Sequence, residues 1–129
     1  MEKVLGLGGF FFRTKDPAKV KAWYAKHLGV TEGAETYEDL GWRQNGGITV
    51  FEPFREDTGY FGDSQQQWML NFRVADLTAI VAQLRAESIE VDVDPQRYPN
   101  GFFARLEDLE GNPIQLWQPV GKWLEEEER

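Results

Sequence analysis

The stretch Phe10-Phe11-Phe12-Arg13-Thr14-Lys15-Asp16 decides the fold, because its pattern returns at residues 70–76 as LNFRVAD. In both copies a mainly apolar segment ends in Phe-Arg, and Asp stands three positions later. A second pair of segments agrees further along each copy, where residues 48–53 (ITVFEP) match residues 114–119 (IQLWQP). Since both ends of both halves agree in the same order, the sequence predicts an internal duplication.

Each half predicts the element order β-α-β-β-β. Asp16 and Asp76 are good helix N-caps, and the apolar residues that follow them have helical spacing. This pattern predicts helices over residues 17–28 and 77–87. Short apolar or alternating runs predict the strands. They are expected at residues 5–13, 31–37, 40–44 and 47–53 in the first half, and at 67–74, 89–93, 101–106 and 114–118 in the second.

The expected fold class is therefore α+β, with two tandem βαβββ modules that form a curved, cupped mixed sheet with helices on the outer face. A chain of 129 residues has room for one domain, so a single domain over residues 1–129 is expected. The boundaries within it follow from the same pattern. Module one spans about 1–53, a polar connector 54–66, module two about 67–119, and an acidic tail 120–129.

Composition excludes several kinds of protein. The net charge of −8 argues against binding to nucleic acid and to anionic membrane surfaces, which need a basic face. The absence of cysteine excludes thiolate zinc sites and cysteine nucleophiles, and a lone histidine, His27, excludes a multi-histidine site within one chain. No apolar run approaches the roughly 20 residues of a membrane span, and the N-terminus lacks a signal-peptide core. We expect a soluble cytoplasmic protein.

Side-chain alternation along strands predicts which residues share a cavity. Under the repeat, Phe10, Phe12, Leu70 and Phe72 are uniformly apolar and suit the face that packs on the helices. The opposite face then combines apolar walls with a few polar groups, which is typical of a small-molecule pocket. A face filled by core side chains or covered by a partner subunit is the alternative. The candidate ligand-binding residues on this face are Phe11, Thr49, Phe51, Met69, Asn71, Gln115 and Trp117.

Other polar and aromatic residues have simpler interpretations. The equivalent residues Arg13 and Arg73 would either bind a ligand anion or pair with acids at the rim. His27 is expected to interact with the dipole at the end of the first helix. The acidic residues Glu107, Asp108 and Glu110, and those at 125–128, are expected to be solvated charge. Trp42, Tyr60 and Trp68 are candidates for a lid or wall.

Three stretches resemble the vicinal-oxygen-chelate superfamily, which includes glyoxalase, bleomycin-resistance and dioxygenase-like proteins. The most specific part is Gly111-Asn112-Pro113-Ile114, followed after one residue by Leu116-Trp117. The resemblance implies paired βαβββ modules, a curved sheet and often a homodimer. It covers nearly the whole chain, through residues 8–17 with 23–24 and 27–30, residues 71–77, and residues 101–105 with 110–119.

The resemblance also implies where a metal would bind. Metal-dependent members place one ligand, usually His or Glu, on the first and last strand of each module. The corresponding positions here are Gly9, Thr49, Met69 and Gln115. Glycine has no side chain, Thr and Met are poor ligands for a hard or borderline divalent cation, and Gln lacks the charge of Glu. We therefore expect neither a metal nor another cofactor, and the family's metal-dependent chemistries are not carried over.

Three functions remain open at this stage. The leading hypothesis is a binding protein that captures a small, partly aromatic ligand in the concave cavity without a metal. The second is a glyoxalase-like lyase or dioxygenase-type enzyme with a non-standard site, which requires an acid or base of perturbed pKa in the pocket. The third is a non-catalytic regulatory or interaction module with a filled cavity. Whether the chain is an enzyme is therefore left undecided.

Overall fold

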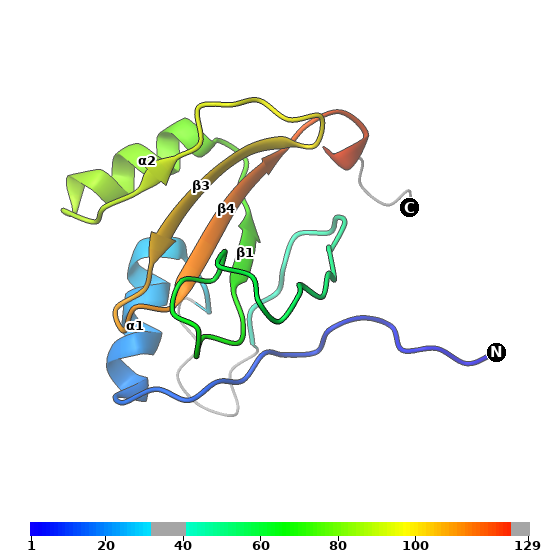
Figure 1. The fold of residues 1–129 in the computed structure, drawn as a ribbon, viewed down its shortest axis with the longest axis horizontal. Coiled ribbons are helices and arrows are strands. Elements are labelled where there is room, and N and C mark those ends of the chain that lie inside the picture. The colour runs from blue at the N-terminus through cyan, green and yellow to red at the C-terminus, as the bar shows by residue number, and fades with distance from the viewer. Residues whose placement is uncertain (32–40, 125–129) are drawn as a thin grey trace.

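The computed structural model describes residues 1–31 and 41–124, and these residues form an α+β fold (Figure 1). Four strands form one open mixed sheet in the order β1-β4-β3-β2. Strands β1 and β4 are parallel, whereas β3 pairs with β4 and with β2 in antiparallel register. In chain order the elements are α1 (Pro17–Leu28), β1 (Leu70–Arg73), α2 (Leu77–Ala86), β2 (Asp92–Val93), β3 (Gly101–Glu107), β4 (Pro113–Pro119) and the 3-10 helix η1 (Gly121–Leu124).

Both predicted helices and their N-caps are confirmed. The Asp16 side chain accepts a hydrogen bond from the Lys19 backbone N–H at 3.2 Å, and the Asp76 side chain accepts one from Ala79 at 3.0 Å. These bonds satisfy backbone donors that have no partner within the helix. Helix α1 ends at Gly29, whose left-handed φ of 73° suits glycine. No helix in residues 1–31 and 41–124 is long and apolar enough to cross a membrane.

The hydrophobic core lies between the two helices and one face of the sheet. Helix α1 contributes Val20 and Tyr24, and α2 contributes Val81 and Leu84 to the same cluster. From the sheet, the cluster includes fully buried residues of β4 and partly buried residues of β1. Phe12, Leu70 and Phe72 pack against this core as predicted, whereas Phe10 is exposed and contacts Phe12 and Trp68 through its ring.

The prediction of strands in the first half is wrong for the residues that the structure describes. Residues 5–13 and 41–53 contain no strand, and the remaining predicted strand positions, 32–40, lie outside the described residues. Two tandem modules are therefore not established. The physical reason is that a helix satisfies its backbone hydrogen bonds locally, whereas a strand needs a second segment in register. Apolar character at residues 5–13 and 47–53 predicts burial, but it does not provide the pairing partner.

Helix α1 is attached to the second half through the turn between β3 and β4. Asp108 is 6% exposed, and its carboxylate accepts a hydrogen bond from the Tyr24 hydroxyl at 2.6 Å. The same carboxylate accepts bonds from the backbone N–H groups of Glu110 and Asn112 and from the Asn112 side chain. Burial, followed by the bond to Asp108, raises the pKa of Tyr24 far above its ordinary value. Tyr24 is therefore a protonated donor that holds α1 to the turn.

Glu110 forms a second attachment at the start of α1. Its carboxylate accepts hydrogen bonds from the backbone N–H groups of Lys15 and Asp16 at 3.0 to 3.2 Å. The prediction that the acids of this turn are merely solvated charge is therefore wrong for Asp108 and Glu110. The acidic residues at 125–128 lie outside the described residues. The turn between β3 and β4 is distant from α1 in sequence but adjacent to it in the fold, and the hydrogen bonds of Asp108 and Glu110 hold the two together.

Candidate ligand-binding face

The sheet face that points away from the helices carries six side chains from three neighbouring strands. Residues paired across adjacent strands project to the same side. The registers pair Gln115 of β4 with Asn71 of β1 and with Arg105 of β3, and they pair Trp117 with Arg73 and Phe103. We call this surface the helix-free face. It comprises Asn71, Arg73, Phe103, Arg105, Gln115 and Trp117.

A short chain of polar contacts occupies the centre of the helix-free face. The Asn71 side-chain amide donates to the Gln115 Oε1 at 2.6 Å, and the Gln115 Nε2 donates to the Tyr60 hydroxyl oxygen at 2.8 Å. The Cζ atom of Arg105 lies 4.4 Å from the centroid of the Tyr60 ring. Tyr60 belongs to the connector, residues 54–66, which crosses in front of the sheet in green in Figure 1. The connector therefore covers part of the face with an aromatic ring.

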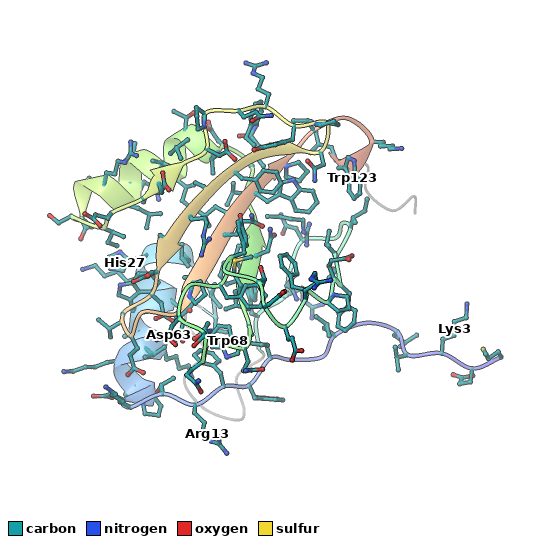
Figure 2. The ribbon with its side chains drawn as sticks, viewed as in Figure 1. Lys3, Arg13, His27, Asp63, Trp68 and Trp123 are labelled. Atoms are coloured by element: carbon teal, nitrogen blue, oxygen red, sulfur yellow. The ribbon has the colours of Figure 1, made fainter. Side chains whose placement is uncertain are left out.

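One end of the face is an aromatic wall. The rings of Phe103 and Trp117 are parallel within 2°, with centroids 6.3 Å apart. The Trp117 indole N–H donates to the Asn100 carbonyl oxygen at 2.8 Å. Trp123 of η1, labelled in Figure 2 near the end of β4, packs edge-on against Trp117. Trp117 is only 2% exposed, so it shapes the wall rather than offering a free surface.

A cavity of about 340 Å³ opens beside Tyr60, between the connector and strands β2 and β3. Its lining combines the rings of Tyr60 and Phe103 with Arg105 and the acids Asp92 and Asp94. The volume lies in the range of small-molecule sites, and the lining mixes aromatic walls with charged groups. The arrangement is therefore suited to holding a planar molecule with polar substituents.

Of the two acids at this cavity, Asp94 accepts hydrogen bonds that favour its ionised form. The backbone N–H of Gln96 and then the hydroxyl of Tyr98, at 2.8 Å, lower the pKa of Asp94 below its ordinary value. The same bond raises the pKa of Tyr98. A carboxylate of lowered pKa is a poor proton acceptor near neutral pH. Asp94 is therefore better suited to binding a ligand group than to general base catalysis.

The structure brings together three of the seven predicted ligand-binding residues: Asn71, Gln115 and Trp117. Met69 lies directly before β1 and is half-buried. Phe11 and Phe51 are 93% and 82% exposed, and Thr49 is also exposed, because their segments are not strands of the sheet.

Phe103 and Arg105 of the helix-free face, and Tyr60 of the connector over it, were not predicted as ligand contacts. Phe103 and Arg105 had a signal in the sequence, because they alternate with the core residues Ala104 and Leu106 along β3. Tyr60 was expected only as part of a lid or wall. It lies in a segment without periodicity, so the sequence gives no direction for its side chain, and the folded connector positions its ring. Of the other two lid candidates, Trp68 packs on Phe10 and Phe12, and Trp42 packs on Phe72.

The two arginines related by the repeat have different surroundings. Arg73 donates hydrogen bonds to the carbonyl oxygens of Asn45 and Gly46, at 2.9 and 3.0 Å, so it holds these residues beside β1. Arg13 is exposed. Among the residues that the structure describes, the hydrogen bonds of Arg73 go to neutral backbone groups, and its binding to a ligand anion stays a prediction. His27 lies in the last turn of α1, as predicted, and packs against Trp23.

The four positions that correspond to the metal ligands do not suit a divalent cation. Gly9 offers no side-chain donor atom, and both ends of the Gln115 amide are already bonded, to Asn71 and to Tyr60. Thr49 and Met69 carry a hydroxyl and a thioether, which are weak ligands for such ions. Among residues 1–31 and 41–124, no three His, Cys, Asp or Glu side chains lie close enough together to hold a metal ion.

Comparison with known proteins agrees with the motifs. The antibiotic-binding protein TnmS3 from Streptomyces sp. CB03234 superposes with a TM-score of 0.64 at 23% identity, over 93% of this chain and 100% of that one. A glyoxylase/bleomycin resistance protein/dioxygenase domain from Frankia sp. EAN1pec gives a TM-score of 0.56 at 16% identity, over 92% and 100%. No curated protein matches the chain significantly. Residues 6–116 match the family model described as Glyoxalase/Bleomycin resistance protein/Dioxygenase superfamily, and the chain therefore belongs to this superfamily.

Proposed function

We propose that this chain binds a small, partly aromatic ligand on the helix-free face, without a divalent metal. The observation that carries the proposal is the hydrogen-bond chain from Asn71 through Gln115 to the Tyr60 hydroxyl, with Arg105 over the Tyr60 ring. A cavity of about 340 Å³ lies next to it. Amide and guanidinium donors orient a ligand, and the stacked Phe103 and Trp117 supply an apolar wall. The antibiotic-binding activity of the neighbour TnmS3 supports the same kind of function.

Quinoline, a soluble planar aromatic compound, tests this proposal. It is expected to raise the melting temperature and to shift the NMR resonance of the Arg105 guanidinium N–H, because the ligand stacks near that group. In a Tyr60→Ala background, where the Tyr60 ring no longer competes for Arg105, Arg105→Met keeps most of the aliphatic stem but removes the charge. We expect it to weaken quinoline binding about fivefold there, as the loss of one cation–π contact predicts. Calorimetric titration measures the affinity.

Arg97→Met is the matched control, because the Arg97 guanidinium lies over Phe102, a ring that packs on the core and not on the helix-free face. We expect it to leave quinoline binding unchanged. Ni²⁺ and Mn²⁺ are expected to leave the melting temperature unchanged. Equal weakening by both substitutions, or stabilisation by these ions with shifts at Gln115, would contradict the proposal.

We also propose that the first half completes a second module against a second copy of this chain, giving a cytoplasmic homodimer. Large apolar side chains of the first half are exposed, among them Leu5, Phe11, Val50 and Phe51. Large apolar side chains left exposed to water favour association with a partner surface that buries them. In such a dimer the remaining ligand candidates, Phe11, Thr49, Phe51 and Met69, would contribute to the binding face.

Sedimentation analysis tests the homodimer. The wild-type chain of 14.9 kDa is expected to sediment as two chains, and Phe11→Asp with Phe51→Asp as one, because each buried charge is costly at an apolar interface. Leu109→Asp, at an exposed apolar position in the turn between β3 and β4, is the control and is expected to remain a dimer. A wild-type chain that sediments as a monomer at all concentrations would exclude this arrangement.

A further inference from the structure

Tyr60 contacts the helix-free face through both its hydroxyl group and its aromatic ring. Tyr60 belongs to the connector and not to a strand, so the backbone of the sheet does not fix the position of its side chain. Side chains from two strands contact Tyr60. The Gln115 amide of β4 donates a hydrogen bond to its hydroxyl, and the Arg105 guanidinium of β3 lies over its ring. Its ring thus covers part of the helix-free face.

The receiving groups match both parts of a phenol. Asn71 bonds to one end of the Gln115 amide at 2.6 Å, which orients the other end toward the Tyr60 hydroxyl at 2.8 Å. A hydroxyl suits this position because it can accept or donate a hydrogen bond. Arg105 lies over the ring face at 4.4 Å, where the electron-rich π surface attracts a cation. One group therefore recognises the hydroxyl and another the aromatic ring.

Tyr60 is held weakly enough to be displaced. Tyr60 is 38% exposed, and Phe54, whose ring stacks on the Tyr60 ring at a centroid distance of 6.0 Å, belongs to the same connector. The cavity lined by Tyr60 and Phe103 lies directly beside it, so a larger fused ring system has room to extend past the position of the phenol. A ligand that takes the place of Tyr60 must displace one hydrogen bond and one cation–π contact of Tyr60. This competition is expected to weaken the apparent affinity of the ligand about tenfold.

We propose that the helix-free face carries a subsite for a hydroxyaryl group, recognised by Gln115 and Arg105, which Tyr60 occupies in the absence of ligand. This inference rests on the proposed function and specifies its ligand class as planar aromatic compounds that carry a phenolic hydroxyl. The connector, residues 54–66, then moves with Tyr60 when such a ligand enters. The hydroxyl is the feature that distinguishes a true ligand from other planar aromatics.

The test uses p-cresol, which is the tyrosine side chain as a free molecule, and toluene, which lacks only the hydroxyl. In the Tyr60→Ala variant, p-cresol is expected to bind about fivefold more tightly than toluene, as one hydrogen bond predicts. It is expected to bind this variant about tenfold more tightly than wild type. NMR titration following the Gln115 amide and the Arg105 guanidinium N–H resonances measures the affinities and reports the position of binding.

Two further variants check the assignment. Adding Gln115→Leu to Tyr60→Ala is expected to bring the ratio of the p-cresol and toluene affinities to about one, because the hydroxyl loses its partner. Tyr60→Phe keeps the ring and frees the Gln115 amide, and its p-cresol affinity is expected to lie between those of wild type and Tyr60→Ala. It also provides the comparison with wild type if Tyr60→Ala does not fold.

The outcomes separate this inference from the proposed function. Equal affinity of p-cresol and toluene for Tyr60→Ala, or a preference that survives Gln115→Leu, overturns the hydroxyaryl subsite. If quinoline still binds at Arg105 in that case, the proposed aromatic-binding function stands. If quinoline does not bind either, the proposed function fails as well. A p-cresol preference that depends on Gln115 supports the subsite.

Discussion

Asp108→Ala is expected to lower the free energy of unfolding by about 4 kcal/mol, because four donors lose a buried acceptor at once. These donors are the Tyr24 hydroxyl, the backbone N–H groups of Glu110 and Asn112, and the Asn112 side-chain amide. Small domains are stabilised by about 5–15 kcal/mol in total, so this loss is a large fraction of it. Urea unfolding followed by circular dichroism measures the change.

A graded series tests the physical reason. Asp108→Asn keeps an oxygen for the N–H groups of Glu110 and Asn112, so about half of the loss is expected. Tyr24→Phe removes one of the four donors, with an expected loss of about 1 kcal/mol. Glu107→Ala, at the exposed neighbouring position, is expected to change stability by no more than about 0.5 kcal/mol. If Asp108→Ala costs no more than Glu107→Ala, the buried network does not support the fold.

Gly101→Ala is expected to cost about 3 kcal/mol, because this position combines a strained backbone with close neighbours. Its φ is +137°, and an added Cβ would clash with the Gln118 carbonyl oxygen and lie 2.9 Å from the Trp117 indole nitrogen. Since Gly101 pairs with Pro119 where β3 begins, the substitution pushes β3 away from β4 and disturbs the aromatic wall. Thermal and urea unfolding give the stability, and the indole N–H resonance of Trp117 reports the displacement.

Gly111→Ala is the matched control. Gly111 also has a positive φ, +86°, but an added Cβ would meet open space. Only the backbone strain remains, and about 1 kcal/mol of destabilisation is expected with an unchanged Trp117 resonance. Equal costs for the two alanines would show that the close approach of β3 to β4 at Gly101 has no energetic consequence.

The parts of the fold that the sequence predicted well are those decided by local chemistry. Asp16 and Asp76 cap helices because their carboxylates reach backbone donors a few residues away. Strands β3 and β4 were predicted from short runs of apolar residues on the two sides of a turn, and the structure pairs these runs as a hairpin. Family membership was inferred from motifs, each made of residues close together in the chain, and the family match over residues 6–116 confirmed it.

The candidate site was predicted only in part, since its residues come from separate segments. Asn71 and Gln115 were found because strand alternation gives the direction of each side chain. The same rule gave directions for Phe11 and Phe51, but these residues are exposed because their segments have no strand to pair with. Direction along a strand is a local property, whereas pairing depends on where another segment lies.

By itself, therefore, the sequence determined the two capped helices, the hairpin of β3 and β4, the family and the poor metal-binding chemistry of Gly9, Thr49, Met69 and Gln115. Only the tertiary structure decided that Asp108 is a buried anchor for α1 and that Tyr60 lies under Arg105. Both contacts join residues that are far apart in the chain, and neither residue type carries a local signal for its partner. The free energy of such contacts comes from burial and complementary geometry, which exist only once the segments have come together.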